Sequence, residues 1–518
     1  MKPLRFLLSA AVLLLSTACS NRQSASVSYE PSWESLSQHT TPEWFMDAKL
    51  GIWAHWGPQC QPEASDWYAR NMYFPGHWQH DYHVRHYGDP ATFGFKDVIH
   101  EWKAEHWNPD TLMTLYRRAG ARYFVSLANH HDNMDLWDSP YQEWNSVNVG
   151  PHKDILAGWK RAADREGLPF GISIHASHAW SWYEGSRAYD GLLTKADGVG
   201  QWWEGMNPQH LYCQNHAPSE RDTEVGIIHS QWTWGGGVCP PSEEYMQNIY
   251  DRTMDAIRKF NPDLVYFDDV VLPFYPYNEK VGLDIASGLY NQNNEAVLLG
   301  KQLNAEQKKC MTWDVERGVP DVIQPDYWQT CTCLGQWHYD RGTYERGHYK
   351  SAAQVIRMLV DIISKNGNML LSVPLRADGM PDEKELAILD AMAAWMKVNG
   401  ESVYGTRPWI CFGEGPTADN AKPVSGFGFN EGASRYSSAD VRYVCKGRTV
   451  YATVLGRAEG ELLLKAFAPT AEKPLRVKSV RLLGGDRCAF RQTPDGLSIT
   501  VPASGANDIA TVFAITTK

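Results

Sequence analysis

Short, almost continuous apolar runs alternate with longer amphipathic stretches through most of the chain. The apolar runs are residues 49–56, 121–131, 169–177, 263–269 and 308–316. Runs of this length without polar alternation are typical of parallel strands that are covered on both faces. The amphipathic stretches at 109–120, 154–167 and 243–260 predict helices between them. Such repeated strand–helix units predict an α/β fold, a (β/α) barrel of the TIM type, with a doubly wound sheet as the alternative.

The pattern changes after Trp409. Residues 441–447, 449–456, 497–502 and 508–515 alternate apolar and polar positions between turn residues. This period of two predicts a C-terminal antiparallel β-sandwich. A helical pattern at 381–398 precedes the change and stops at an Asn-Gly pair. We therefore expect a barrel domain at 41–398 and a sandwich domain at 399–518.

The first residues have the pattern of an export signal. Two basic residues precede an apolar run at 6–15, which is too short to span a bilayer. The run leads through small residues to Cys19, an arrangement that resembles a bacterial lipoprotein box. We expect a signal peptide at 1–19, lipidation of Cys19, and a Ser-rich polar tether at 20–40, with secretion without lipidation as the alternative. The predicted location is the periplasm or outer membrane of a Gram-negative bacterium, with the lipid anchor as the membrane contact.

Composition narrows the class of partner. The chain has 49 Lys and Arg against 60 Asp and Glu, a formal charge of −11, and no long basic run. This balance argues against nucleic acid or an anionic membrane surface as the main partner. Aromatic residues make up 12% of the chain and include 22 Trp. Because such rings can stack on sugar faces, the composition leans toward a carbohydrate ligand.

Polar side chains follow each predicted strand. They are His55 and Trp56, His130 and His131, His175, Asp268 and Asp269, and Asp314 and Glu316. Any one of them could be a structural residue. Agreement at five strand ends favours a site, because active sites of (β/α) barrels form at the carboxyl ends of the strands.

Two chemistries fit this ring of residues. Carboxylates facing each other across a pocket suit glycoside hydrolysis by paired Asp or Glu. A hydrolytic metal site is the weaker alternative, with His178 and the other histidines as ligands; there is no HExxH motif, and adjacent His residues on a strand point to opposite faces. The ten cysteines form no CxxC repeat, and a metal or redox role for Cys331 and Cys333 is disfavoured. No GxSxG nucleophile motif follows a strand.

Five segments resemble glycoside hydrolase family 29, the α-L-fucosidases. They are residues 49–73, 128–156, 261–270, 366–379 and 399–409, in family order. The resemblance implies a (β/α) barrel with a C-terminal β-sandwich, no metal or other cofactor, and retention of anomeric configuration through a covalent glycosyl–enzyme intermediate. It implies an exo-acting enzyme that releases terminal α-L-fucose from an oligosaccharide or polysaccharide.

The resemblance also assigns residues to roles. The nucleophile would be Asp268, and its rival Asp269 would be turned away by strand alternation. The residues expected to bind the sugar are His55, Asp66, Trp67, His130, His131 and His175. Asp66 stands where relatives usually carry Glu, and His175 stands where many carry Tyr.

The general acid/base follows from no single motif. Some relatives carry Glu after a strand Trp, but here Gln329 follows Trp328, and an amide cannot exchange a proton in the relevant range. The nearest strand end offers Glu316, with Asp314 as its rival. Arg317 would oppose acid function if it turned inward, and an ion pair between Glu316 and a surface Arg is the competing structural interpretation.

Departures from the family leave the exact sugar open. Asn129 replaces a common Lys, and Asn133-Met134 replaces a common Gly-Phe. L-Galactose is L-fucose with a hydroxyl on C6, so extra polar groups near that carbon would make the protein an α-L-galactosidase. From another class, a non-catalytic glycan-binding lipoprotein would use the same aromatics but would not need Asp268.

Overall fold

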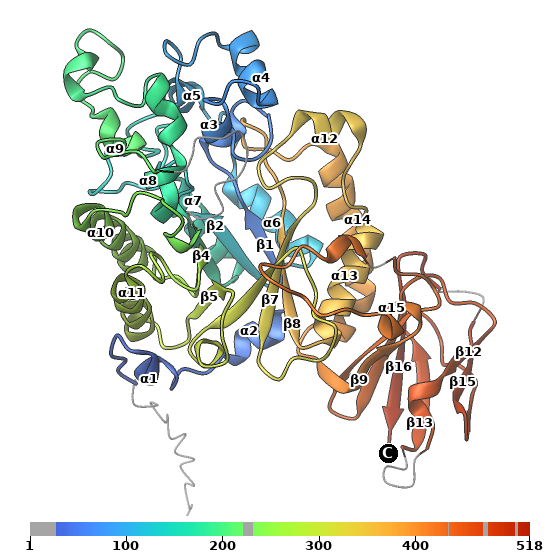
Figure 1. Ribbon diagram of the computed structural model, residues 1–518. Helices are drawn as coiled ribbons and strands as arrows, with labels where there is room; N and C mark the ends of the chain where they lie inside the picture. The colour runs from blue at the N-terminus through green and yellow to red at the C-terminus, as the bar shows by residue number, and fades with distance from the viewer. Residues whose placement is uncertain (1–26, 221–231, 434, 470–474, 503–505) are drawn as a thin grey trace, which may run out of the picture.

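Eight parallel strands form a closed barrel in chain order. The computed structural model describes residues 27–220, 232–433, 435–469, 475–502 and 506–518. β1 pairs with both β2 and β8, which closes the sheet and excludes the doubly wound alternative (Figure 1). The barrel strands are β1 (Leu50–Ala54), β2 (Tyr123–Leu127), β3 (Phe170–Ile174), β4 (Leu264–Val270), β5 (Val297–Lys301), β6 (Thr312–Glu316), β7 (Trp328–Cys333) and β8 (Gly367–Ser372). The predicted barrel is confirmed.

One strand number was wrong. The run at 308–316, expected as the fifth strand, is the sixth, because β5 precedes it in the barrel. β5, β7 and β8 were absent from the predicted barrel. Gly300 and Lys301 end the apolar run of β5, and β8 begins with Gly367 and Asn368, so neither resembles a long apolar run.

The three helices predicted between strands are present. α6 (Pro109–Ala119), α7 (Ile155–Glu166) and α10 (Glu243–Phe260) lie outside the barrel with α11 (Glu279–Gln292), α13 (Ala352–Ser364) and α14 (Glu383–Asn399) (Figure 1). Shorter helices are α1 (Trp33–Leu36), α2 (Glu43–Ala48), α3 (Tyr68–Asn71), α4 (Trp78–His86), α5 (Phe95–Glu101), α8 (Ala179–Trp182), α9 (Pro208–Tyr212), α12 (Arg341–Arg346) and α15 (Pro416–Asp419). Gly120 and Gly167 end α6 and α7 with φ of 118° and 65°, a backbone region that favours glycine.

The barrel interior is filled by side chains. Trp53, Tyr123, Tyr266 and Leu299 belong to one buried apolar cluster inside the strands. A side chain at Gly51 would collide with the ring of Tyr123. The absence of a side chain at Gly51 therefore leaves room for this ring in the barrel interior. The barrel is therefore a packed core, and any ligand site has to lie at one of its ends.

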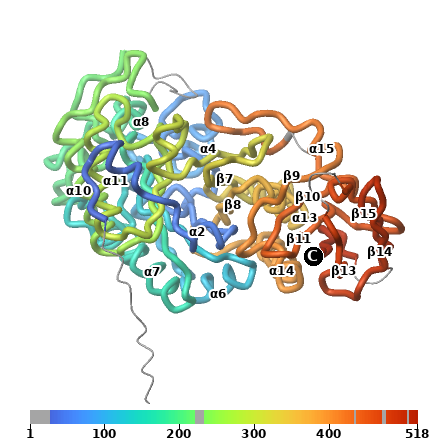
Figure 2. The backbone as a smooth tube through the Cα atoms, turned by 90° about the horizontal axis from the view of Figure 1, so that it is seen from below, coloured from blue at the N-terminus to red at the C-terminus, as the bar shows by residue number. Residues whose placement is uncertain are grey.

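Two antiparallel sheets follow the barrel. One has the order β13-β16-β11-β10-β9 and the other β12-β15-β14, and a single apolar cluster lies between them. Their strands are β9 (Arg407–Glu414), β10 (Val441–Lys446), β11 (Thr449–Val454), β12 (Glu461–Leu464), β13 (Val477–Leu482), β14 (Phe490–Thr493), β15 (Gly496–Thr500) and β16 (Thr511–Thr517). The five-stranded sheet lies beside α13 in both views, and the three-stranded sheet lies on its far side (Figures 1 and 2). This confirms the predicted antiparallel C-terminal module.

The expected tether is described from residue 27, and from there it packs on the barrel. Tyr29 N–H donates to Asn291 Oδ1 at 2.7 Å, and Leu36 is fully buried. Residues 20–26 of the expected tether lie outside the described residues, and so does Cys19. Within the described part of the chain, no helix combines the length and apolarity needed to cross a membrane. The nine described cysteines are all free thiols.

Candidate active site

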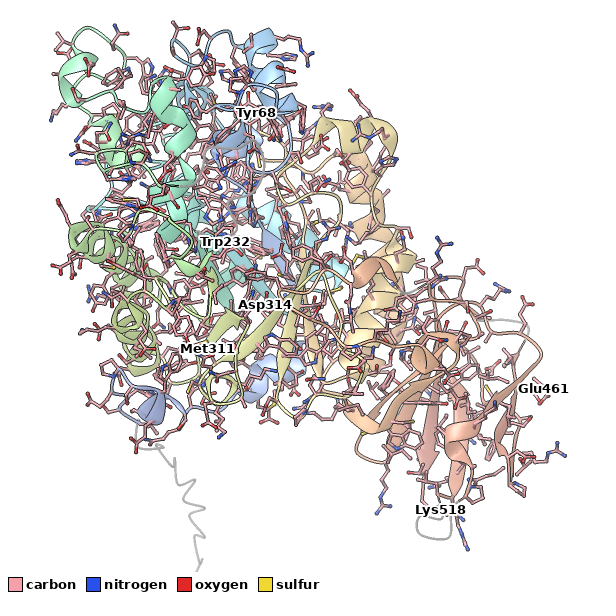
Figure 3. All side chains as sticks on the ribbon, in the orientation of Figure 1. Tyr68, Trp232, Met311, Asp314, Glu461 and Lys518 are labelled. Carbon is pink, nitrogen blue, oxygen red and sulfur yellow. The ribbon has the colours of Figure 1, made fainter. Side chains whose placement is uncertain are left out.

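A pocket opens at the carboxyl ends of the barrel strands. Its volume is about 830 Å³, solvent at the mouth included. Imidazoles enter it from the segments after β1, β2, β3 and β7, and charged groups enter from β4, β5 and β6. Figure 3 labels Trp232 of the pocket wall above Asp314 of the barrel interior. The pocket is thus divided into a hydrogen-bonding side and a charged side.

Asp268 lies on the charged side, near the end of β4. Its Oδ1 accepts a hydrogen bond from Lys301 Nζ at 2.5 Å, and its Oδ2 lies 3.2 Å from His131 Nε2 and 3.5 Å from His175 Nδ1. Burial raises the pKa of this carboxyl, but the Lys301 ammonium and the two imidazoles outweigh burial and hold the pKa well below its usual range. Asp268 is therefore a carboxylate at neutral pH, the form in which it can act as a nucleophile.

Glu316 faces Asp268 across the same ammonium. Lys301 Nζ also donates to Glu316 Oε2 at 2.6 Å. The two bonded carboxylate oxygens are consequently at most about 5 Å apart, a limit that agrees with the ~5–5.5 Å between carboxyl groups of retaining glycosidases better than with the ~6.5–9.5 Å of inverting ones. Burial alone would lower the pKa of Lys301, but the neighbouring carboxylates raise it well above its usual value. Glu316 thus pairs with a buried Lys from inside the pocket, whereas Arg317 turns away and binds Glu431 at 2.7 Å.

The rival carboxylates do not line the pocket. Asp269 accepts from Ser177 Oγ at 2.7 Å and lies 2.8 Å from His178 Nε2, so the rival nucleophile is paired with a histidine of the metal interpretation outside the pocket lining. Asp314 is buried below the pocket, where Gln329 Nε2 donates to it at 3.0 Å. Burial raises the pKa of Asp314 to about 6. Gln329, excluded as an acid from the sequence, lies in this same interior layer.

Neutral imidazoles form the opposite side. His55, His130 and His175 are all nearly fully buried and line the pocket. Burial lowers the pKa of His55 and His130 well below the usual value, and it lowers the pKa of His175 to about 4. Neither ring nitrogen of His55 has a hydrogen-bond partner among the described side chains and backbone. Because buried polar atoms without partners are costly, His55 is prepared to bond a ligand's hydroxyls.

His131 does not line the pocket, although its neighbour His130 does. Its ring is buried between Asp268 and the backbone carbonyl of His175, which lies 2.7 Å from Nδ1. His131 therefore orients the carboxylate, and it is absent from the pocket lining that His130 belongs to. Trp56, also singled out at a strand end, is core: its indole N–H donates to Arg376 O at 2.9 Å.

Asp66 and Trp67 both line the pocket, as expected from the resemblance. Asp66 Oδ1 accepts from the backbone N–H of His338 at 2.5 Å, and Oδ2 accepts from that of Trp337 at 3.3 Å. The shorter acid thereby anchors the segment after β7. Trp67 adopts a left-handed backbone with φ of 60°, which is uncommon for a non-glycine residue and places its ring at the pocket wall.

Two groups of histidines could in principle hold a metal ion. His55, His130 and His338 form one, and His130, His131 and His175 form the other, each with ligand atoms within 4.8 Å of one another. His131 already bonds Asp268, and His130 Nδ1 lies 2.8 Å from Gln59 Nε2. The lowered pKa of His55, His130 and His175 favours their neutral form, which can hydrogen-bond a hydroxyl as well as it could bind a cation.

Asn129 and Asn133, which differ from the residues common in the family, make structural hydrogen bonds outside the pocket. Asn129 Oδ1 accepts from the backbone N–H groups of His175 and Ala176, at 3.1 and 3.2 Å. Asn133 Oδ1 accepts from Arg252 at 2.6 Å. Neither lines the pocket, whereas the other two departures, Asp66 and His175, both do.

Several pocket residues were missed from the sequence. They are Lys301, Trp232, Trp337, His338, Phe427 and Phe429. Lys301 ends β5, which was not among the predicted strands. Trp337 and His338 follow β7, where an aromatic–His pair after an apolar run was a usable signal. No local signal marks the two phenylalanines, because they come from the connection between β9 and β10 of the C-terminal module.

Comparisons with known proteins agree with this architecture. The α-L-fucosidase family model matches residues 15–401. Tissue α-L-fucosidases of Bos taurus and Homo sapiens are each 25% identical to this chain, over 95% of it and 91% of their own length. A Thermotoga maritima α-fucosidase solved in complex with fucose superposes with a TM-score of 0.69 at 22% identity, covering 94% of this chain and 100% of that one. The chain belongs to glycoside hydrolase family 29, the α-L-fucosidases.

Proposed function

We propose that this α-L-fucosidase works by double displacement, with Asp268 as nucleophile and Glu316 as general acid/base. The observation that carries the proposal is the pair of carboxylates held within about 5 Å by one ammonium at the strand ends, the spacing typical of retention. Asp268 attacks the anomeric carbon while Glu316 protonates the departing oxygen. Glu316 then takes a proton from the water that releases fucose.

The other pocket residues bind and orient the sugar. His55 and His130 bond ring hydroxyls, and Trp67 covers one face of the sugar. His131 holds Asp268 in position through its bond to Oδ2. Because a site built to hydrogen-bond hydroxyls discriminates through those bonds, His55→Ala or His130→Ala should reduce kcat/KM strongly, whereas treatment with a chelator should not.

L-Galactosides are the second candidate substrates. His175 and His338 each turn Nδ1 toward a carboxylate, whereas their Nε2 atoms have no hydrogen-bond partner among the described residues, and both rings line the pocket. A hydroxyl on C6 would find a partner there, whereas the methyl group of fucose would not. Comparing kcat/KM for the 4-nitrophenyl α-L-fucoside and α-L-galactoside decides which sugar is preferred.

The cellular location rests on the export signal alone. We place the mature protein in the periplasm or on the outer membrane, anchored through lipidated Cys19. Cys19→Ala should move the protein from the membrane fraction to the soluble fraction. An unchanged distribution would remove the lipid anchor from the proposal.

The nucleophile is tested by Asp268→Gly. Turnover of an aryl α-L-fucoside should fall by about 10⁴-fold or more, since no covalent intermediate can form. Added azide should enter the vacated space and yield β-L-fucosyl azide. The neighbour provides a control: Asp269→Asn should stay within about tenfold of the parent, because its carboxylate lies outside the pocket.

Two results would contradict the proposal. Substantial residual activity in Asp268→Gly, with no azide product, would move the nucleophile elsewhere. A parent enzyme that binds fucose but turns over neither aryl glycoside would favour the glycan-binding alternative.

A further inference from the structure

A segment of the C-terminal module is built into the edge of the barrel. The connection between β9 and β10 returns to the barrel as an orange tube in Figure 2 and pairs with the end of β6. Glu316 N–H donates to Phe427 O at 2.8 Å, and Phe429 N–H donates to Glu316 O at 2.7 Å. The segment 425–431 therefore binds both backbone groups of the proposed acid/base residue.

Side-chain contacts fix the far end of this segment. Asn430 Oδ1 accepts from Val319 N–H at 2.8 Å. Glu431 accepts from Thr332 Oγ1 at 2.6 Å and lies 3.0 Å from Lys350 Nζ. With the Arg317 bond, Glu431 is tied to three barrel side chains, so the segment is held firmly against β6 and β7.

Gly428 allows the close approach. Its φ is +133°, and a Cβ at this position would lie 2.1 Å from Glu316 O. The residues on either side consequently point their rings into the pocket. Phe427 lies with its ring centroid 5.8 Å from Lys301 Nζ, whereas Phe429 is 61% exposed at the mouth.

The order of groups along the pocket sets the direction of the substrate. The imidazoles of His55, His130 and His175 are buried, the two carboxylates are partly exposed, and Phe429, whose backbone N–H donates to Glu316 O, has the most exposed side chain of the lining. The acid must contact the glycosidic oxygen, so the leaving group extends from Glu316 toward the open end. An exposed aromatic face at that point matches the apolar face of a sugar ring.

We propose that segment 425–431 forms a subsite for the leaving group, in which Phe429 stacks on a sugar. The natural substrates are then fucosides whose fucose is attached to another sugar. This inference rests on the proposed function, because Glu316 as the acid defines the direction of the leaving group. It assigns part of substrate recognition to the C-terminal module.

The test compares substrates with and without a sugar as leaving group. The leaving group of α-L-fucosyl fluoride is fluoride, which has no ring to stack and departs without a proton from an acid. The kcat/KM for this substrate therefore reports only on fucose binding and the nucleophile. The second substrate is whichever of the α1,2-, α1,3-, α1,4- and α1,6-linked fucosyl oligosaccharides the parent enzyme hydrolyses fastest. Phe429→Ala should lower kcat/KM for the oligosaccharide by about tenfold or more and leave that for the fluoride unchanged.

Matched variants separate stacking from general damage. Phe429→Trp should retain oligosaccharide activity, because it keeps a flat ring. Phe490→Ala removes another exposed Phe, from β14, and should change neither substrate. Gly428→Ala should displace the segment and reproduce the oligosaccharide loss with a larger effect, since the collision lies at the backbone of Glu316.

The two substrates distinguish a failure of the leaving-group subsite from a failure of the proposed catalytic function. Equal kcat/KM for parent and Phe429→Ala on the oligosaccharide would overturn the subsite, as would a parent enzyme that hydrolyses the fluoride but none of the oligosaccharides. A parent enzyme inactive on the fluoride would instead overturn the proposed function.

Discussion

Two neighbouring aspartates at the end of β4 have opposite environments. The Asp268 carboxylate lies at the pocket and contacts the Lys301 ammonium and two imidazoles. The Asp269 carboxylate lies outside the pocket lining and pairs with His178. Strand alternation predicted this division from the sequence alone. The same alternation places Asp314 and Glu316 on one face of β6, and there the outcome depends on depth: only Glu316 reaches the pocket.

The depth difference predicts distinct phenotypes on β6. Glu316→Ala should lose most activity on a fucoside with a poor leaving group and much less on an activated aryl fucoside, because only the former needs protonation. Azide should accelerate the aryl reaction and yield α-L-fucosyl azide, the anomer opposite to that formed by Asp268→Gly. Asp314→Asn is the paired variant, and it should affect both substrates equally.

Equal, modest losses in Glu316→Ala on both substrates would exclude it as the acid. A leaving-group-dependent loss in Asp314→Asn would transfer the role to that residue. Both variants are measured by initial rates on the same two substrates.

At the scale of elements, sequence patterns predicted helices that depend on one continuous stretch of chain. They missed site residues whose role depends on contacts between distant segments. Helix α10 was predicted with its observed bounds, because its apolar face and its Ser242 cap lie in one continuous stretch. Lys301 could not be predicted as a site residue, since its importance comes from lying between carboxylates on two other strands. Phe429 lies 113 positions from Glu316, the residue it accompanies, and only the folded β9–β10 connection brings them together.

The connection between α1 and α2 contains a residue with a calculable pH effect. His39 stacks on Tyr290 of α11 with ring centroids 3.8 Å apart, and burial lowers the pKa of His39 from 6.5 to about 4. Between these values the unfolded chain binds a proton that the folded chain does not. This residue therefore costs stability as pH falls from 6.5 toward 4, approaching about 3 kcal/mol at the lower limit.

His39→Phe should remove that cost while keeping a ring on Tyr290. The drop in melting temperature between pH 7 and pH 4.5 should be smaller for the variant than for the parent. His106→Phe, at an exposed position, serves as the control and should follow the parent. An identical pH dependence of the His39 variant and the parent would contradict the assignment.

At the scale of the whole molecule, a buried ion pair joins barrel and sheets. Arg442 of β10 binds Asp361 of α13, which also accepts from Lys365 Nζ at 2.9 Å and from Tyr436 at 3.1 Å. Burial opposes ionisation, but Lys365 and Arg442 outweigh it and lower the pKa of Asp361 to about 2. The pair's contribution is therefore complete above pH 3.8 and is lost as pH falls through about 2.

Removing one partner should weaken the junction. Arg442→Met leaves Asp361 with reduced compensation, which should cost about 3 kcal/mol of unfolding free energy at neutral pH. Arg457→Met, which breaks exposed pairs with Glu459 and Asp508, should lower the unfolding free energy much less than Arg442→Met, because solvent screens exposed ion pairs. Thermal unfolding at pH 7 compares the two, and equal small losses would show that the junction does not depend on the Arg442 pair.

The ammonium of Lys301 changes partners during the double displacement proposed above. In the resting enzyme it is shared between Asp268 and Glu316, so two acidic side chains compete for one positive charge. When Asp268 becomes an ester it loses its negative charge, and the same cation is left to Glu316 alone. The covalent bond of the intermediate thereby redistributes the electrostatic field of the pocket without the movement of a side chain.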